Sequence, residues 1–143
     1  MSKRIPIGTV WKDVYLPAIK AAEALHGAKP AKAVETLSVA PAYERVYLYV
    51  PYLRGLAFLR QRKGTEAGVE FRKVVDHPGA SWNFLPEIYP LSRLGLARAH
   101  TMTGDLDNAR SSYKALLEYW KDADADYKPA LEARREYQAL LKQ

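Results

Sequence analysis

The chain has 143 residues, of which 48% are hydrophobic and 27% are charged, as expected for one folded domain with a buried core. It contains no cysteine, which excludes disulfides, thiolate metal sites and cysteine nucleophiles. No apolar run approaches the roughly 18 residues of a membrane span, and the N-terminus lacks the apolar core of a signal peptide. We therefore expect no membrane insertion and a cytoplasmic location, with an extracytoplasmic one open if a membrane segment lies upstream.

The net charge of +6 favours polyanions and acidic peptides as partners in general terms. The basic residues are spread along the chain without one dense block. This pattern is more typical of solvated helix faces than of a dedicated basic surface.

The N-terminal third is predicted to hold an arm and two helices. Residues 1–9 form the arm, since Pro6 and Gly8 discourage helix. Apolar residues at helical spacing predict a helix from residue 10 to residue 26, which Gly27 ends. Pro30 suits the first position of a second helix, which continues to about residues 40–41.

The middle third is predicted to hold a second pair of helices. Residues 41–50 form a connection, and a third helix runs from residue 51 to residue 62, where Gly64 stops it. Thr65 can cap a fourth helix that ends near Asp76. Residues 77–85 are expected to be a loop insert.

The C-terminal third is predicted to hold a hairpin and a last helix. The fifth helix begins at Pro86 or Pro90 and ends near residue 103, and the sixth spans about residues 105–121 after a tight turn at Gly104-Asp105. The seventh begins at Asp126 or at Lys128-Pro129, after an acidic linker that caps it. Its apolar stripe and charged outer face are typical of a capping helix.

Equivalent residues return at fixed intervals along the chain. Ala33 and Ala67 are 34 positions apart, as are Leu37 and Phe71. The next interval is longer: Gly55 and Gly64 return 40 positions later at residues 95 and 104, and Ala67 and Phe71 return 42 positions later at Ala109 and Tyr113. We assign the longer interval to the 77–85 insert and to a longer turn between the helices of the last hairpin. A period of 34 residues, with small and aromatic residues in these places, is that of the tetratricopeptide repeat.

The chain resembles the tetratricopeptide-repeat regions that lie C-terminal to bacterial serine/threonine protein kinases and winged-helix regulators. The matching runs are residues 15–21, 29–37, 52–59, 70–79, 94–100 and 120–124. The resemblance implies an all-α, right-handed α-α superhelix of three helix hairpins (about 10–42, 43–79 and 84–123) and a cap (126–142). It also implies an interaction or sensing region of a larger signalling protein, with native sequence upstream of Met1. The early Trp of the repeat is absent; Pro17, Pro51 and Leu91 stand there.

No pattern of catalytic or metal-binding residues is found. The three histidines lack metal-ligand spacing, and no phosphate-binding loop, nucleophile elbow or kinase motif occurs. The Asp122–Asp126 run is similar to a calcium loop, but Tyr127 replaces the required Gly and Glu132 falls one residue short of the last ligand position. We predict no enzyme, no metal and no cofactor.

Candidate binding residues lie on the first helix of each hairpin, because these helices line the concave face of such a superhelix. Tyr15, Tyr49 and Tyr89 recur at equivalent places and offer rigid contact area to a peptide. Tyr52, Arg60 and Arg98 lie along the same helices, and arginine pairs well with carboxylates. The alternative is that the tyrosines pack between repeats and the arginines face water. A buried Arg98 would need a carboxylate partner, such as Asp76 or Glu70.

The sequence thus favours a protein–protein interaction module, a monomer or weak homo-oligomer. Its partner is expected to be a protein or peptide, and the positive net charge favours an acidic one. The alternative is a basic helical-repeat module that binds nucleic acid. That alternative is weaker because Ala18, Tyr52 and Ser92, at equivalent positions, do not resemble a base-reading code. A third possibility is homo-oligomerisation through residues Trp82–Phe84.

Overall fold

The computed structural model describes residues 7–38, 44–78 and 86–143, and these residues form helices, turns and no strand. The predicted all-α class is therefore confirmed for the described part of the chain. Residues 1–6, the predicted end of the second helix (39–41) and the Trp82–Phe84 insert lie outside the described residues. Among the helices described, none is both long and apolar enough to cross a membrane.

The first helix is continuous from Ile7 to His26 and contains one wide turn. It consists of α1 (Ile7–Val10), a π-helical turn (Trp11–Tyr15) and α2 (Leu16–His26). The N–H of Leu16 donates to the carbonyl of Trp11, five residues earlier. Pro17 cannot donate to the preceding turn and its ring crowds the carbonyl there, so the wide turn accommodates it. Residues 7–9, expected in the arm, belong to this helix.

The remaining helices are α3 (Pro30–Leu37), α4 (Tyr49–Arg60), α5 (Gly64–Val75), α7 (Ile88–Met102), α8 (Leu106–Tyr119) and α9 (Lys128–Leu140). They complete three hairpins, α2 with α3, α4 with α5 and α7 with α8, and end with the single helix α9.

Two predicted caps are wrong. The helix α5 begins at Gly64 with Lys63 at its N-cap, so Thr65 lies inside the helix and does not cap it. The N-cap of α9 is Tyr127, which makes no side-chain capping bond, so the acidic linker before it does not cap this helix either. The side chain of Asp105, in contrast, caps α8 by accepting from the N–H of Asn108.

The turns that join α2 to α3, α4 to α5 and α7 to α8 have the same backbone conformation. Each contains one residue in the left-handed region: Ala28 (φ 57°), Arg62 (φ 62°) and Gly104 (φ 77°). The next residue in each turn donates its N–H to a carbonyl five residues earlier: Lys29 to Ala24 (2.7 Å), Lys63 to Phe58 (2.9 Å) and Asp105 to His100 (2.9 Å). This is the Schellman arrangement that ends a helix and turns the chain back.

The turn geometry corrects the predicted register of the last hairpin. Gly104 is equivalent to Arg62, 42 residues earlier, and not to Gly64. The three turns have equal length, so the extra residues do not lie in a longer turn. The interval of 42 residues from Arg62 to Gly104 is the same as from Ala67 to Ala109 and from Phe71 to Tyr113, so the added residues lie before the turn of the last hairpin. Helix α7 is also three residues longer than α4, with 15 residues against 12.

Small residues allow the hairpins to approach closely. Ala33, Ala67 and Ala109 are all fully buried, one on the second helix of each hairpin. The ring of Phe71 lies between two glycines, where an added Cβ would approach it to 2.8 Å at Gly55 and to 2.4 Å at Gly95. The core therefore depends on the ring of Phe71 packing directly on the backbone of Gly55 in α4 and of Gly95 in α7.

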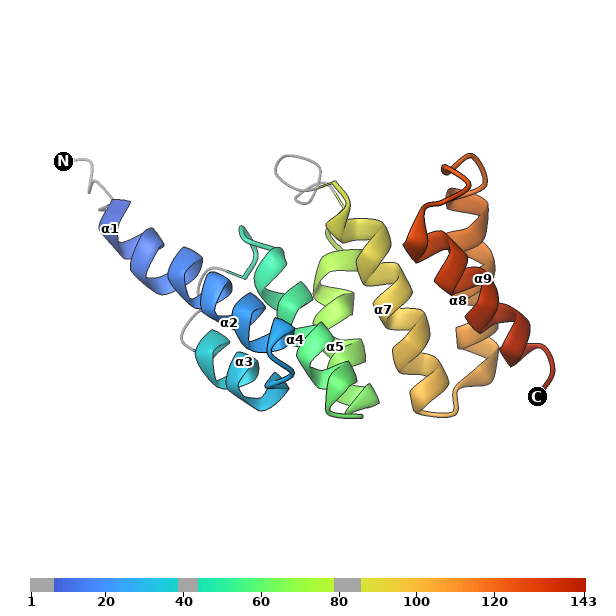
Figure 1. Ribbon diagram of the computed structural model, residues 1–143, viewed down its shortest axis with the longest axis horizontal. Helices are drawn as coiled ribbons and strands as arrows, with labels where there is room; N and C mark the ends of the chain where they lie inside the picture. Colours follow the sequence, from blue (N-terminus) through green and yellow to red (C-terminus); the bar gives the residue numbers. More distant parts are fainter. Residues whose placement is uncertain (1–6, 39–43, 79–85) are drawn as a thin grey trace.

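The hairpins stack in chain order into an elongated array, with α1 at one end and α9 at the other (Figure 1). Each helix packs against the next one in the chain, and the first helices also touch each other in succession, α2 on α4, α4 on α7 and α7 on α9. The described part is thus held together by contacts within each hairpin and between hairpins that are neighbours in the chain.

Candidate functional site

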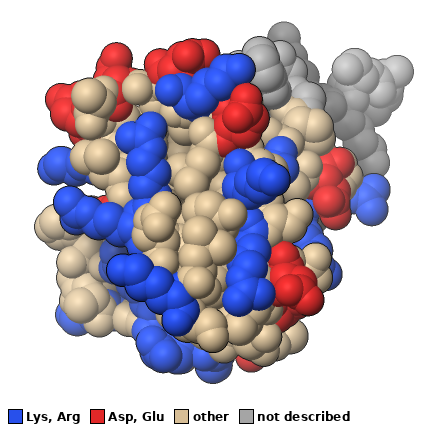
Figure 2. All heavy atoms as spheres, turned by 90° about the vertical axis from the view of Figure 1, so that its right-hand side faces the viewer, with Lys and Arg blue, Asp and Glu red and all other residues tan. Residues whose placement is uncertain are grey.

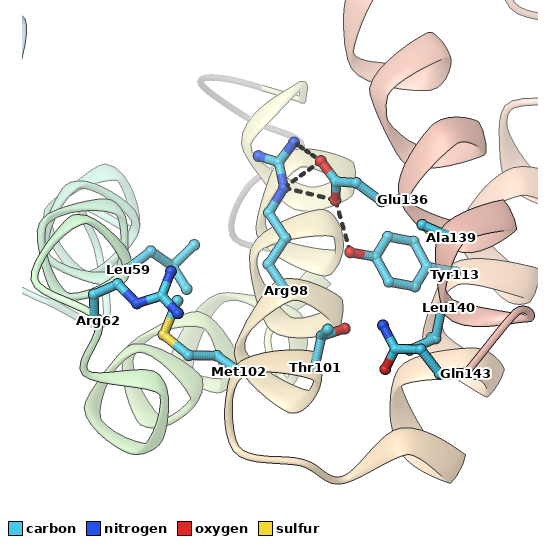
Figure 3. A pocket seen from close by; sticks show the side chains of 10 residues that line it. All are labelled: Leu59, Arg62, Arg98, Thr101, Met102, Tyr113, Glu136, Ala139, Leu140 and Gln143. Atoms are coloured by element: carbon cyan, nitrogen blue, oxygen red, sulfur yellow. Dashed lines mark hydrogen bonds and ion pairs between the residues drawn. The ribbon is translucent and has the colours of Figure 1, made fainter.

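A cavity of about 490 Å³ lies beside the C-terminal halves of the first helices. Its walls come from the end of α4, from α7, from α9 and from one side chain of α8 (Figure 3). On α7 and α9 the lining residues recur three or four positions apart, so that one face of each helix is turned to the cavity. The lining residues are Leu59, Arg62, Arg98, Thr101, Met102, Tyr113, Glu136, Ala139, Leu140 and Gln143.

One wall of the cavity carries an ion pair that is satisfied within the protein. The guanidinium of Arg98 donates through Nε and Nη2 to Glu136, with distances between 2.7 and 3.1 Å, and Nη2 also reaches Glu132 at 2.8 Å. The hydroxyl of Tyr113 donates to the second oxygen of Glu136 at 2.7 Å. Burial raises the pKa of the Tyr113 hydroxyl, and the negative charge of Glu136 raises it further, so the phenol remains a donor.

The two glutamates also raise the pKa of Arg98. Burial alone would lower the pKa of Arg98, but the hydrogen bonds and charges of Glu136 and Glu132 outweigh it and raise the pKa above its ordinary value. The positive charge of Arg98 is therefore already paired with two carboxylates within the protein.

The opposite wall is apolar with one cation. Leu59 and Met102 are half-buried there, and Figure 3 shows the side chain of Arg62 beside both. Arg62 is exposed and has no ion-pair or hydrogen-bond partner in its side chain within the described part of the chain. The cavity thus combines an apolar surface, a neutralised polar wall and one available positive charge.

Of the six predicted binding residues, Arg98 lines this cavity. Its carboxylate partners are Glu132 and Glu136 of α9, so the expected pairing with Asp76 or Glu70 is wrong. Glu70 instead accepts from Lys73 at 2.9 Å in the buried cluster around Arg54.

Tyr15 and Tyr49 lie together at the N-terminal end of the molecule. Their rings stack at 6.3 Å, and Tyr47 contacts both while Trp11 contacts Tyr15. Tyr15 is 40% exposed, whereas the hydroxyl of Tyr49 is buried. Burial raises the pKa of Tyr49, and the neighbouring Tyr15 adds to the rise.

The other three predicted residues are elsewhere. Tyr52 packs edge-on against Phe71 at 6.3 Å, and burial raises its pKa. Tyr89 accepts a hydrogen bond from Arg93, whose guanidinium lies 5.7 Å from the ring centre. Arg60 donates to the carbonyl of Leu25 near the end of α2. The six residues therefore do not share one cavity, and their role in binding stays a prediction.

Sequence reasoning missed Arg62 and Glu136. Glu132 and Glu136 are four positions apart on the predicted cap, which places them on one helix face toward the preceding helix. That spacing is a usable signal. Arg62 gave none, because a left-handed residue that is not Gly, Asn or Asp has no sequence signature.

Charge is unevenly distributed at the C-terminal end of the molecule. Figure 2 faces this end and shows Lys and Arg around an uncharged patch, with Asp and Glu toward its upper and right edges. The exposed cations of α8 and α9, with the residues just beyond α9, are Lys114, Lys128, Arg134, Arg135 and Lys142.

The chain matches no family model, and it has no significant match among curated proteins or solved structures. Within the described residues, no three His, Asp or Glu side chains come together as a metal site.

Proposed function

We propose that the chain is a tetratricopeptide-like interaction module, a right-handed superhelix of three hairpins and a cap, which binds a segment of a partner protein. Support for the repeat comes from the three identical turns and from the equivalent burial of Ala33, Ala67 and Ala109. Support for binding comes from the cavity. It is built by side chains from successive repeat units, as the extended binding surfaces of repeat proteins are.

The size and lining of the cavity suit one or two side chains of a peptide rather than a flat protein surface. Apolar side chains of Leu59, Met102 and Leu140 offer burial, while the hydroxyl of Thr101 already donates to the carbonyl of Ala97 at 3.0 Å. Binding energy would thus come mainly from buried apolar area, with polar groups setting orientation.

The wider context follows the resemblance noted in the sequence. We propose an appended regulatory or sensing region of a larger bacterial signalling protein, located in the cytoplasm, without catalytic activity of its own. The partner is a protein or peptide.

The experiment compares two neighbouring residues on α9. Ala139 lines the cavity and Gln138 does not, although both are exposed. The probe is a positional-scanning library of decapeptides that are acetylated at the N-terminus and amidated at the C-terminus. We expect the wild type to retain a defined subset, Ala139→Trp to bind it at least about tenfold more weakly, and Gln138→Trp to match the wild type.

Retention of no peptide by the wild type, or equal binding by the two tryptophan variants, would refute the proposal. Circular dichroism of each variant checks that the helices are intact.

The basic end in Figure 2 keeps nucleic acid as a second candidate. It is tested with mixed-sequence oligonucleotides over a salt series. Tight binding that falls steeply with salt would favour this candidate over the peptide module. We expect weak binding, because Asp and Glu border the basic face.

A further inference from the structure

Arg62 has a backbone conformation that opposes its side chain. Its φ is 62°, in the left-handed region where a Cβ crowds the backbone and where glycine is favoured. The equivalent position in the last turn is Gly104, with φ 77°, and in the first turn it is Ala28, with φ 57°. The same turn therefore forms with glycine, and nothing in the turn itself requires an arginine.

The turn places the side chain of Arg62 at the edge of the cavity. The Schellman bonds around it, from Arg62 N–H to Leu59 (3.0 Å) and from Lys63 N–H to Phe58 (2.9 Å), hold the residue at the edge of the cavity. Its side chain lies beside Leu59 and Met102, across from α9 (Figure 3). A strained residue that persists at a cavity edge points to a role in binding.

The anion on the opposite wall does not neutralise Arg62. Glu136 already accepts from Arg98 and from Tyr113, and Glu132 pairs with Arg98. Arg62 is exposed and its side chain has no hydrogen-bond or ion-pair partner within the described residues. The charge of the cavity edge is thus complementary to a negatively charged ligand.

We propose that Arg62 selects partner segments in which an acidic side chain lies next to an apolar one. The apolar side chain rests against Leu59 and Met102, and the carboxylate accepts two parallel hydrogen bonds from the guanidinium. The bound apolar side chain removes water from beside the guanidinium and so strengthens this pair. This inference rests on the proposed peptide-binding function and names the chemistry that the cavity recognises.

Replacing Arg62 by glycine should raise the stability of the protein and weaken its binding of acidic peptides, and these opposite effects provide the test. Arg62→Gly relieves the left-handed strain and removes the cation. We expect its melting temperature to rise by roughly 3 °C. Ala28→Gly is the matched control, since it relieves the same strain in the equivalent turn and removes no charge.

The probe is again the acetylated and amidated decapeptide library, in which side chains supply the only carboxylates. For the wild type and for Ala28→Gly, we expect Asp and Glu to be enriched next to an apolar position. For Arg62→Gly, we expect that enrichment to fall at least about tenfold while the apolar preference remains.

Three outcomes would overturn the inference. They are a wild type that selects peptides without acidic preference, an Arg62→Gly variant that keeps the preference, and a lower melting temperature for Arg62→Gly. In the first two, peptides are still retained and the proposed function stands. If the wild type retains no peptide, both fall together.

Discussion

Arg98 of α7 and Glu136 of α9 are joined by a forked ion pair, 38 residues apart in the chain, with Nη2 to Oε1 at 2.7 Å and Nε to Oε2 at 3.0 Å. The hydroxyl of Tyr113 on α8 donates to the same carboxylate. Glu136 of the last helix therefore binds side chains from both helices of the preceding hairpin. These hydrogen bonds, together with the apolar cluster around Leu116 and Ala133, hold α9 against the preceding hairpin.

Replacing that carboxylate should loosen the last helix. In Glu136→Gln the charge that pairs with Arg98 is lost while the size of the side chain is kept, and we expect the free energy of unfolding to fall by about 1–3 kcal/mol. Urea unfolding monitored by circular dichroism measures this change.

Glu132→Gln is the control, because the Glu132 side chain is 55% exposed. An exposed pair contributes little, so a loss under about 1 kcal/mol is expected. If both variants lose the same amount, the forked pair has no special role in holding α9.

The close approach of Phe71 to Gly95 should make that glycine irreplaceable. An added methyl would lie 2.4 Å from the ring, so Gly95→Ala should destabilise the fold by about 1–3 kcal/mol despite the better helix propensity of alanine. The melting temperature of the purified variant reports the effect.

Gly68 provides the comparison within the same layer of the core. Its added Cβ would lie 3.7 Å from Ala99, an ordinary contact, so Gly68→Ala should stabilise the protein by about 0.5–1 kcal/mol. A stabilising Gly95→Ala would show that Phe71 moves aside easily.

The stability of the protein should depend on the ionisation of Glu44. Burial by itself would raise the pKa of Glu44, but the hydrogen bonds and charges of Arg54 and Lys73 outweigh it and hold the pKa below its ordinary value of 4.5. The unfolded chain therefore binds a proton there at higher pH than the folded chain does. The stabilisation is present above pH 4.5 and is lost as the pH falls through the lower folded value.

Urea unfolding at several pH values between 7 and 3 gives the free energy of unfolding of the wild type and of Glu44→Gln. The difference between the two proteins at each pH measures the contribution of the ionised Glu44 side chain. We expect the variant to be less stable at pH 7 and to approach the wild type at low pH. Glu35→Gln, which disrupts an exposed pair with Lys32, should give a difference that is small at every pH. A constant difference for Glu44→Gln would contradict the assignment.

Local sequence was sufficient to predict the helices and their pairing into hairpins. Apolar residues at helical spacing and the Pro and Gly residues between them placed the described helices within about two residues, except for the start of the first helix and the end of the second, which lies at Leu37. Two positions show the limit of such reasoning. Gly64 and Gly104 looked equivalent because both are glycines near a turn, yet the left-handed residue of the second turn is Arg62. Similarly, Gly8 lies inside the first helix although glycine weakens helices, because packing of Val14 and Ala21 downstream outweighs local propensity.

The sequence by itself determined an all-helical chain with returning small and aromatic residues, because these features arise from contacts between residues close along the chain. Only the tertiary structure decided the partners of Arg98, the separation of Tyr15 and Tyr49 from Tyr89, and the cavity beside Arg62. Those features depend on how one hairpin packs against the next, which contacts between residues close along the chain do not specify. Pairing across such a seam is set by three-dimensional packing: the spacing of Glu132 and Glu136 places both on one helix face, but only the packed structure shows that this face meets Arg98.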